Sequence, residues 1–317
     1  MRAVEVDGST LYCLGASTDP AAVADLLGRS RVRVEPAAPG APLAHKMVAL
    51  AAHDLSAAQL AEICSSTADS WVHLVSSGFG YPHVAALARM NLVTRSARAY
   101  AAALSDYVVT HHVLRCERQA AGAVPKPFNR RTALVVGFGA FGRTVAGALA
   151  RLGVGVTVIR PRSRTAHPFG REQAAIALGE LPEHAADLLV VALPEMAELA
   201  GFIDEKLLRC LRPDGHIVNP ARPSPVDFDA LLRWLASGSG HLTADVEEGE
   251  RERRLGPWAE RGRVTLTPHI AWQPWDHDPL YHGDWLDIYA TATPGAAVAE
   301  GRVRIDPREI AEDYLIP

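Results

Sequence analysis

The sequence is poor in the residues that build disulfide or zinc frameworks, because its 317 residues include only four cysteines. They are Cys13, Cys64, Cys116 and Cys210, and none lies in a C-x-x-C pair or at zinc-finger spacing. We therefore expect reduced thiols, with neither disulfides nor a bound metal. The sequence also lacks an apolar run near the ~20 residues that span a membrane, and residues 1–10 lack the apolar core of a signal peptide. A cytoplasmic location is the expectation.

An excess of positive charge is absent as well. The net charge is -4 and the isoelectric point is about 6.4, so the chain has no general attraction to nucleic acid or to anionic membranes. A hydrophobic fraction of 48% and a charged fraction of 21% are typical of globular proteins. The length predicts about two domains, each large enough for its own core. We expect a small molecule as the ligand, and neither nucleic acid nor a membrane as a partner.

Residues 132–164 are predicted to form a strand, a glycine turn, a helix and a second strand. The two apolar runs, residues 133–136 and 154–159, have the length and composition of buried parallel strands. The first run is followed by Gly137-Phe138-Gly139-Ala140-Phe141-Gly142, and then by apolar residues at helical spacing. In this strand-turn-helix context the G-x-G-x-x-G pattern is typical of a dinucleotide site; the alternative is a βαβ unit with a purely structural role.

Each part of the glycine turn has a physical role in such a site. Gly137 permits a sharp turn, Gly139 allows a pyrophosphate to approach the backbone, and Gly142 allows the helix to pack closely on the strand. The diphosphate then lies on free N–H groups at the helix start, which include Ala140 and Phe141, at the positive end of the helix dipole. We expect these five residues to bind the cofactor.

The end of the second strand indicates which dinucleotide binds. An NAD site usually has an Asp or Glu about 20 residues beyond the glycines, where it accepts hydrogen bonds from the adenosine ribose. Here no carboxylate occurs, and the side chains at the strand end are those of Arg160, Arg162, Ser163 and Arg164. Because guanidinium groups form charge-assisted hydrogen bonds with a 2′-phosphate, the sequence predicts NADP(H). A solvated basic loop is the alternative.

The rest of the chain alternates strand-like and helix-like segments, which is typical of parallel sheets flanked by helices. We expect a substrate domain in residues 1–103, joined by residues 275–317, and a dinucleotide-binding domain in residues 104–274. A largely apolar helix over residues 97–117 is predicted to connect the two domains. A further helix is predicted over residues 205–212.

A second glycine turn follows the strand predicted over residues 71–76. Ligands of open α/β sheets bind beyond the carboxyl ends of strands. The backbone around Gly78, Phe79 and Gly80 is therefore a candidate cradle for an anionic group of the substrate. A turn selected only for its geometry is the alternative.

Three further strand ends carry an Arg, a Glu and a His. The motifs are Leu193-Pro194, Asn219-Pro220-Ala221-Arg222, Asp245-Val246 with Glu250 close behind, and Thr267-Pro268-His269-Ile270-Ala271. Together with the glycine turn, they resemble the D-isomer-specific 2-hydroxyacid dehydrogenases over most of residues 74–271. The resemblance implies a Rossmann doubly wound parallel sheet for the dinucleotide, a smaller flavodoxin-like α/β domain for the substrate, and a homodimer formed through the cofactor domain. It also implies that Leu193, Pro194, Pro220, Ala221 and Asp245 contact the cofactor.

The residue types fit the reduction of a 2-oxo acid, which requires a hydride, a clamp for the carboxylate and a proton for the developing alkoxide. Arg222 offers a planar, permanently charged fork to the carboxylate and carbonyl oxygens. His269 is the side chain best able to donate and recover a proton near neutral pH. Glu250, if hydrogen-bonded to His269, would favour the imidazolium. Glu247 and Glu248 are alternative partners for the histidine.

The functional hypothesis is an NADPH-dependent enzyme that interconverts a small 2-oxo acid and a D-2-hydroxy acid, of the glyoxylate/hydroxypyruvate reductase type. Phe79 and Tyr81, with Trp272, would form a wall of the substrate pocket, or alternatively would pack between the domains. A 3-phosphoglycerate-type or a specialised biosynthetic dehydrogenase is the alternative within the family. A catalytically silent dinucleotide-binding module is the alternative outside it.

Overall fold

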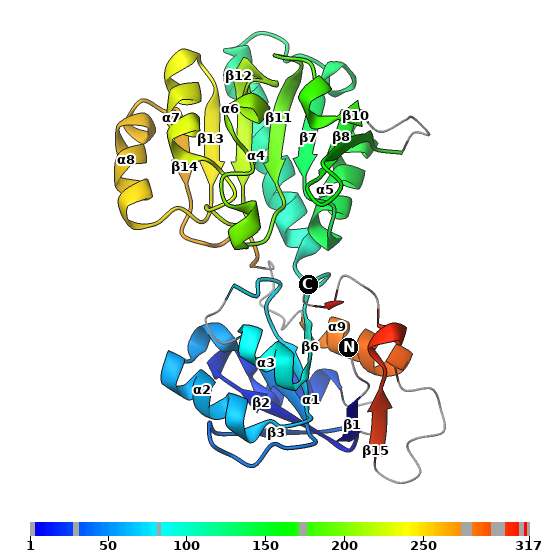
Figure 1. Ribbon diagram of the computed structural model, residues 1–317. Helices are drawn as coiled ribbons and strands as arrows, with labels where there is room; N and C mark the ends of the chain where they lie inside the picture. The colour runs from blue at the N-terminus through cyan, green and yellow to red at the C-terminus, as the bar shows by residue number, and fades with distance from the viewer. Residues whose placement is uncertain are drawn as a thin grey trace. The chain divides into compact units, whose positions relative to one another are not determined.

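The computed structural model describes residues 4–27, 32–80, 84–170, 176–273, 281–292, 302–310 and 314–315. The chain divides into two compact units. Unit 1 comprises Met1–Tyr100 and Pro274–Pro317, and unit 2 comprises Ala101–Gln273. These divisions fall within a few residues of the boundaries expected from the sequence at residues 103 and 274. Each unit has its own sheet, shown in Figure 1, and its own hydrophobic core.

Unit 1 is built on a five-stranded parallel sheet in the order β3-β2-β4-β5-β6. The strands are β2 (Thr10–Leu14), β3 (Arg33–Pro36), β4 (Met47–Leu50), β5 (Trp71–Leu74) and β6 (Leu92–Arg95). Counted within this sheet in chain order, the arrangement is 2-1-3-4-5, which is the flavodoxin-like order. The predicted flavodoxin-like fold of the smaller domain is therefore confirmed.

Local signals begin the first helices of unit 1. These helices are α1 (Pro20–Leu26), α2 (Ala57–Ser66) and α3 (Val84–Met90). The carboxylate of Asp19 accepts the backbone N–H of Ala21 at the start of α1, and Ser56 and Gln59 form a capping box at the start of α2. Helices α2 and α3 pack on β4 and β5 in one hydrophobic cluster, so that face of the sheet is covered.

The C-terminal part of the chain belongs to unit 1. Helix α9 (Tyr281–Ala292) stacks Trp285 on Trp71 of β5, with 5.4 Å between ring centroids. Asp284 of the same helix accepts the backbone N–H groups of Arg98 and Ala99. Strand β15 (Arg302–Ile305) pairs antiparallel with β1 (Val4–Asp7) in a separate two-stranded sheet.

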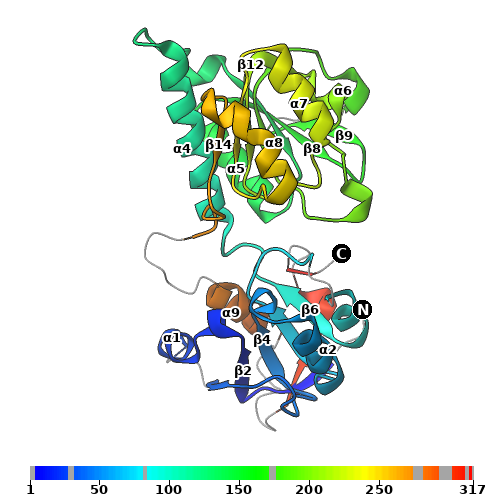
Figure 2. The same ribbon diagram turned by 90° about the vertical axis from the view of Figure 1, so that its left-hand side faces the viewer.

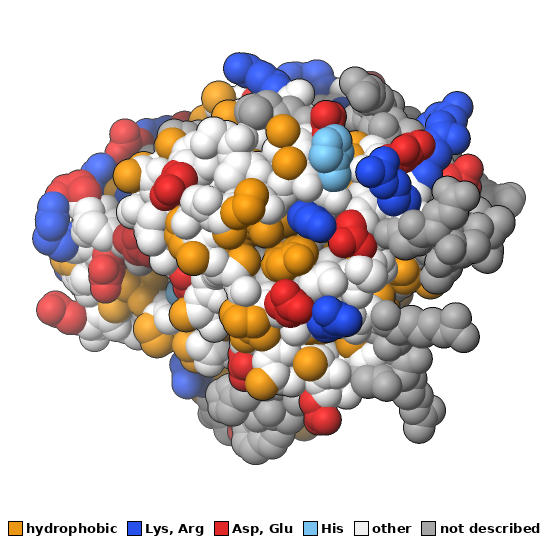
Figure 3. Space-filling view, turned by 90° about the horizontal axis from the view of Figure 1, so that it is seen from below, with side chains coloured by type: hydrophobic (Ala, Val, Ile, Leu, Met, Phe, Trp, Pro, Cys, Tyr) orange, Lys and Arg blue, Asp and Glu red, His pale blue; other side chains and the backbone are white. Residues whose placement is uncertain are grey.

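On the face shown in Figure 3, basic and acidic side chains are interspersed with apolar ones, as the small net charge leads one to expect.

Unit 2 is built on an eight-stranded sheet in the order β10-β9-β8-β7-β11-β12-β13-β14. The strands are β7 (Thr132–Val136), β8 (Gly155–Arg160), β9 (Thr165–Pro168), β10 (Ile176–Ala177), β11 (Ala186–Val191), β12 (Leu211–Asn219), β13 (His241–Ala244) and β14 (Val264–Leu266). Strands β8, β7 and β11 to β14 are parallel. The chain order reverses between β7 and β11, which is the position where doubly wound sheets bind dinucleotides. The predicted Rossmann-type sheet is confirmed.

The helices of unit 2 lie on both faces of this sheet, as Figure 2 shows. Helices α4 (Ala101–Ala120) and α5 (Ala140–Arg151) bury Val108, Val145 and Leu149 in one cluster. Helices α6 (Glu205–Leu208), α7 (Phe228–Ser237) and α8 (Gly249–Glu260) contribute Leu207, Leu231 and Leu255 to the cluster on the other face. Among the described residues, no helix is long and apolar enough to cross a membrane.

One element of unit 2 differs from the sequence-based expectation. The helix predicted over residues 205–212 ends at Leu208, because Leu211 and Arg212 already belong to β12. The charged run that begins after Glu248 forms α8, although it includes Pro257. Beside β8 the sheet continues with the antiparallel strands β9 and β10.

Three histidines form a buried cluster between α4 and the sheet. His112 and His216 place their Nδ1 atoms 3.3 Å apart, and His216 and His241 place their ring centroids 5.5 Å apart. Burial lowers the pKa of His112 and of His241 to about 4, and it lowers the pKa of His216 well below 6.5. We call His112, His216 and His241 the histidine cluster. It is neutral at physiological pH and acts as part of the core.

Candidate functional site

The glycine turn between β7 and α5 has the geometry that a dinucleotide requires. Gly137 has φ 109°, and a Cβ at this position would lie 2.2 Å from the carbonyl oxygen of Ala192. A Cβ on Gly142 would lie 2.2 Å from the carbonyl oxygen of Gly137, whereas nothing lies within 4 Å of a Cβ on Gly139. Only glycine therefore fits at the first and third positions, and the second leaves space for a ligand.

The N-terminus of α5 is suited to an anion. Gly139 is the N-cap residue, no side chain caps the helix, and its first turn contains no acidic residue. The first N–H groups of a helix have no partner within the helix, so those of Ala140, Phe141 and Gly142 remain available to a diphosphate. Leu193, which follows β11, is buried, and its Cδ2 would lie 3.1 Å from a Cβ on Gly137. Pro194 next to it is half-buried. These residues fit a dinucleotide.

The basic loop predicted to select NADP(H) is a tight turn between β8 and β9. Arg160, Arg162, Ser163 and Arg164 are exposed there. The Arg160 guanidinium lies over the ring of Phe138 in the glycine turn, 4.7 Å from its centroid. This contact is a cation–π interaction, and it holds the guanidinium beside the glycine turn. Sequence reasoning did not select Phe138, whose only signal was its place between two glycines.

Arg222 follows β12 in a turn held by Asn219. The buried Asn219 side chain accepts the N–H of Ala221 and donates to the carbonyl oxygen of Arg222. Arg222 donates from Nη1 to the carbonyl oxygen of Ala221 at 2.7 Å, and it is half-buried. No carboxylate pairs with it among the described residues, so its remaining donors are available to an anionic ligand. Pro220 is buried and shapes the same turn.

Asp245 holds the loop that carries His269. Its carboxylate is buried and accepts hydrogen bonds from Thr267 Oγ1 at 2.5 Å, from the Ile270 N–H at 2.9 Å and from the Ala271 N–H at 2.8 Å. The sequence-based interpretation assigned Asp245 to the cofactor. In the structure both carboxylate oxygens accept hydrogen bonds from this loop, so the residue also positions it. The contact of Asp245 with the cofactor stays a prediction.

His269 lies in an unusual backbone conformation. Its φ is 56°, which non-glycine residues rarely adopt, and its side chain is exposed. Trp272 donates from its indole nitrogen to the carbonyl oxygen of His269 at 2.8 Å, so the two residues belong to one ordered turn. Tyr107 of α4 reaches the same loop through a 2.7 Å hydrogen bond with Thr267. The loop therefore presents the imidazole outward from a fixed backbone.

The structure does not bring Glu250 to His269. Glu250 is exposed in the first turn of α8, where its carboxylate pairs with Arg253 at 2.5 Å. The alternative Glu247 is buried and paired with Arg251 at 2.6 Å, and Glu248 is the N-cap residue of α8. The expected contact failed because the charged segment is helical, which directs its side chains to one another at i, i+3 and i, i+4 spacing.

Two side chains hold the glycine turn of unit 1, which the structure describes up to Gly80. Ser76 donates to the carbonyl oxygen of Gly78, and Arg95 donates from Nη1 to the carbonyl oxygen of Ser77. The Arg95 guanidinium also lies 5.1 Å from the centroid of the Phe79 ring. A cationic side chain therefore lies against this turn. Tyr81, which the sequence offered as a further aromatic wall, lies outside the described residues.

The predicted residues of unit 2 come together at one edge of its sheet. The glycine turn, Leu193, Arg222, Asp245 and the His269 loop all follow the carboxyl ends of parallel strands, which lie at the same edge in Figure 1. Strand pairing therefore joins residues that are far apart in sequence. In the part of the chain that the structure describes, no group of three or more His, Cys, Asp or Glu side chains is arranged to hold a metal.

The fold and this edge define a dinucleotide-binding α/β protein. The profile of the "D-isomer specific 2-hydroxyacid dehydrogenase, NAD binding domain" matches residues 91–271, which is more than half of the chain. The chain therefore belongs to the D-isomer-specific 2-hydroxyacid dehydrogenases, a family of oxidoreductases, as the sequence motifs predicted.

Curated relatives are similar over part of the chain. Glyoxylate/hydroxypyruvate reductase A of Serratia proteamaculans is 32% identical over 145 residues, which are 43% of this chain and 44% of that protein. Erythronate-4-phosphate dehydrogenase of Escherichia coli is 31% identical over 177 residues, which are 54% of this chain and 44% of that protein. The chain thus spans less than half the length of these relatives.

Solved structures share the fold over nearly the whole chain. A D-isomer specific 2-hydroxyacid dehydrogenase from Lactobacillus delbrueckii, in its NAD-complexed form, has a TM-score of 0.68 at 15% identity and covers 96% of this chain and 100% of that one. One from Xanthobacter autotrophicus, in complex with NADPH and MES, has a TM-score of 0.66 at 20% identity and covers 96% and 99%. At these identities the likeness shows the two-domain fold.

Proposed function

We propose that the protein is an NADPH-dependent reductase that interconverts a small 2-oxo acid and a D-2-hydroxy acid. The observation that carries this proposal is the edge of unit 2. There a dinucleotide-binding turn, a guanidinium without a carboxylate partner at Arg222 and a fixed, outward-facing His269 all follow neighbouring parallel strands. These groups supply a clamp for an anionic substrate and a proton at the same edge.

Each residue has a separate task in the reaction. When bound, the reduced nicotinamide supplies the hydride that adds to the carbonyl carbon. Arg222 binds the substrate carboxylate, because its planar fork matches two oxygens and cannot lose its charge. The imidazolium of His269 donates a proton to the carbonyl oxygen, which leaves the product as a hydroxy acid and the histidine neutral. In the reverse direction the neutral imidazole accepts that proton.

The cofactor preference rests on Arg160. Its guanidinium lies over Phe138 beside the glycine turn, and the turn after β8 contains no carboxylate to accept hydrogen bonds from a ribose. An Arg160→Ala substitution should raise the Michaelis constant for NADPH about tenfold or more, since a charge-assisted pair is lost, and should change that for NADH little. A wild-type enzyme that prefers NADH by tenfold or more would contradict the assignment of NADP(H).

The substrate is proposed to be of the glyoxylate or hydroxypyruvate type. The similarity to a glyoxylate/hydroxypyruvate reductase A supports this choice, and the equally distant erythronate-4-phosphate dehydrogenases keep a phosphorylated hydroxy acid as the alternative. We also propose that Phe79 with Gly78 and Gly80, and Trp272 beside His269, contact the substrate. Homodimer formation through unit 2 is a further proposal, and sedimentation velocity of the full chain tests it.

The decisive experiment follows the loss of NADPH absorbance with a panel of 2-oxo acids. Wild type should turn over at least one of glyoxylate, hydroxypyruvate and pyruvate. His269→Gln should lower kcat by about 100-fold or more, as expected for loss of a general acid, whereas Arg222→Gln should mainly raise the Michaelis constant of the acid. Unchanged turnover in His269→Gln would refute its role as the proton donor.

The pairing of Glu250 with Arg253 favours a second candidate, a dinucleotide-binding module without turnover. Glu250→Gln and Glu247→Gln discriminate between the candidates. If Glu250 leaves Arg253 and engages His269 during the reaction, only Glu250→Gln should shift the pH dependence of kcat, since Glu247 is held by Arg251. NADPH binding with no turnover on any acid would support the binding module instead.

A further inference from the structure

A pocket at the amino edge of the unit 2 sheet contains a buried arginine with no acidic partner. The pocket has a volume of about 340 Å³ and lies between the end of α4, the segment before β7 and the start of β12. Arg131 is only 5% exposed. It lies at the opposite end of β7 from the glycine turn, because it precedes the first residue of the strand while Gly137 follows the last.

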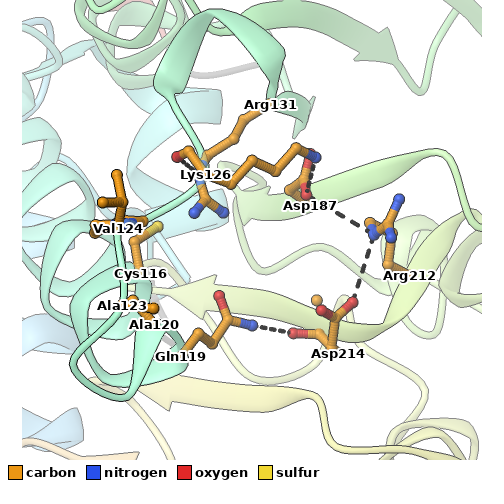
Figure 4. A pocket seen from close by; sticks show the side chains of 12 residues that line it. Cys116, Gln119, Ala120, Ala123, Val124, Lys126, Arg131, Asp187, Arg212 and Asp214 are labelled. Carbon is orange, nitrogen blue, oxygen red and sulfur yellow. Dashed lines mark hydrogen bonds and ion pairs between the residues drawn. The ribbon is translucent and has the colours of Figure 1, made fainter.

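The surroundings of Arg131 leave most of its hydrogen-bonding capacity unused. Its Nε donates to the carbonyl oxygen of Lys126 at 3.0 Å, which fixes the plane of the guanidinium. Among the described residues, neither Nη atom makes a hydrogen bond or an ion pair. Figure 4 shows the guanidinium directed into the space between the lining residues, with Cys116 on one side. Four N–H donors therefore face the pocket.

The acidic groups of the pocket are already engaged by other cations. Asp187 is buried and accepts two hydrogen bonds from the Lys126 ammonium, at 2.8 and 3.0 Å, and one from the Thr132 N–H at 2.9 Å. Asp214 pairs with Arg212 at 3.5 Å. Three cations and two carboxylates thus line the pocket, and one positive charge remains uncompensated.

A buried charge without a counterion is costly to a protein, and an anion that binds beside it removes that cost. The planar fork of a guanidinium matches two oxygens of a phosphate or a carboxylate. Since a water molecule occupies about 30 Å³ of liquid, the pocket can hold a compact anion with several waters. Gln119 contributes a polar wall, where its amide donates to the carbonyl oxygen of Asp214.

We propose that this pocket is a second ligand site, which binds the phosphate or carboxylate group of a small metabolite through Arg131. It is separate from the candidate active-site residues of unit 2, which lie at the carboxyl edge of the sheet. The ligand acts as the counterion that Arg131 lacks within the protein.

The test is isothermal titration of the full chain saturated with NADPH, with inorganic phosphate in one arm and succinate in the other. Tighter binding of phosphate assigns a phosphoryl group and tighter binding of succinate assigns a carboxylate, and either supports the site. Arg131→Gln should weaken binding by about tenfold or more, since charge-assisted hydrogen bonds are lost. Arg130→Gln is the matched control, because Arg130 is the exposed neighbour and should leave binding unchanged.

Two further variants keep the result interpretable. Arg222→Gln should retain the binding, because Arg222 belongs to the candidate active site; loss of binding in this variant would place the anion there and overturn the proposal. Arg131→Lys keeps the charge and should retain part of the affinity. It replaces Arg131→Gln as the test variant if Arg131→Gln does not fold. Binding of neither probe to wild type, or equal binding to wild type and Arg131→Gln, would also overturn the proposal.

Hydrogen–deuterium exchange supplies a readout that a purely structural arginine would not change. The bound probe should slow exchange in residues 116–131 and 211–215 of wild type, and not in Arg131→Gln. In anion-free buffer, Arg131→Gln should melt at or above the wild-type temperature, because an unpaired buried charge has been removed. Protection in the same segments of Arg131→Gln would refute the role of the guanidinium.

Discussion

The loop that presents His269 should depend on the carboxylate of Asp245. Asparagine at this position keeps the shape of the side chain and one carbonyl oxygen, which can still accept from Thr267 and from the Ile270 N–H. Its amide group, however, would face the Ala271 N–H, which now donates to the second carboxylate oxygen at 2.8 Å. Asp245→Asn therefore replaces a charge-assisted hydrogen bond with two opposed donors in a buried site.

The size of the effect follows from these contacts. A hydrogen bond to a charged group contributes about 1.5–3 kcal/mol, and a buried donor left unsatisfied costs a similar amount. We expect Asp245→Asn to lower the free energy of unfolding of unit 2 by about 2–3 kcal/mol. His269 has φ 56°, so its backbone should relax when the loop loosens. Because a misplacement of about 1 Å can reduce a rate about 100-fold, kcat should fall by about 10- to 100-fold.

Urea unfolding and NADPH turnover measure the two effects separately. Asp204→Ala provides the control, since Asp204 caps α6 through the Leu207 N–H at 2.9 Å and does not contact the His269 loop. Loss of this cap should cost about 1 kcal/mol of stability and leave kcat unchanged. If Asp245→Asn matches wild type in kcat, or if Asp204→Ala loses activity to the same degree, the positioning role of Asp245 is wrong.

Three further predictions test the same structure. Burial lowers the pKa of His216, whereas an unfolded histidine titrates near pH 6.5, so the stability from the histidine cluster is present above pH 6.5 and is lost as pH falls toward 4. The melting temperature should therefore decline as pH falls over this range, and the decline should be shallower in His216→Gln. A constant melting temperature over this range would contradict the prediction. Gly142→Ala should weaken NADPH binding measured by fluorescence titration, because its Cβ would overlap the Gly137 carbonyl; wild-type affinity would show that the turn adapts. Tyr107→Phe should lower the free energy of unfolding by about 1 kcal/mol and should lower kcat less than Asp245→Asn does, since the Thr267 hydroxyl keeps its hydrogen bond to the Asp245 carboxylate. A larger loss of kcat in Tyr107→Phe than in Asp245→Asn would contradict this prediction.

Sequence patterns predicted the elements whose causes are local. The cap residues Asp19 and Ser56 begin helices through a local signal, because their side chains reach N–H groups two or three residues away. The glycine turn was predicted for the same reason, since Gly137 and Gly142 answer steric demands within one strand-turn-helix unit. The motifs around Arg222 and His269 could be selected because each lies close behind the end of a strand, β12 or β14.

Pairings across the chain could not be predicted from the sequence. Glu250 was expected to contact His269 because its motif resembles that of the family, yet the helical form of α8 gives it Arg253 as a neighbour. Asp245 was assigned to the cofactor from the same resemblance, and only the return of the chain after β14 shows that its carboxylate also holds a loop some 25 residues further on. Both outcomes depend on where a distant segment lies.

The family, the strand-turn-helix unit and the glycine turn could be predicted from the sequence, because they depend on residue types at short spacing. Which charges have partners became visible only in the folded chain. Lys126 and Arg212 reach the carboxylates of Asp187 and Asp214, and Arg131 reaches none. The physical reason is that ion pairing is fixed by distances of a few ångströms between side chains on different strands and helices, and only the folded chain sets those distances.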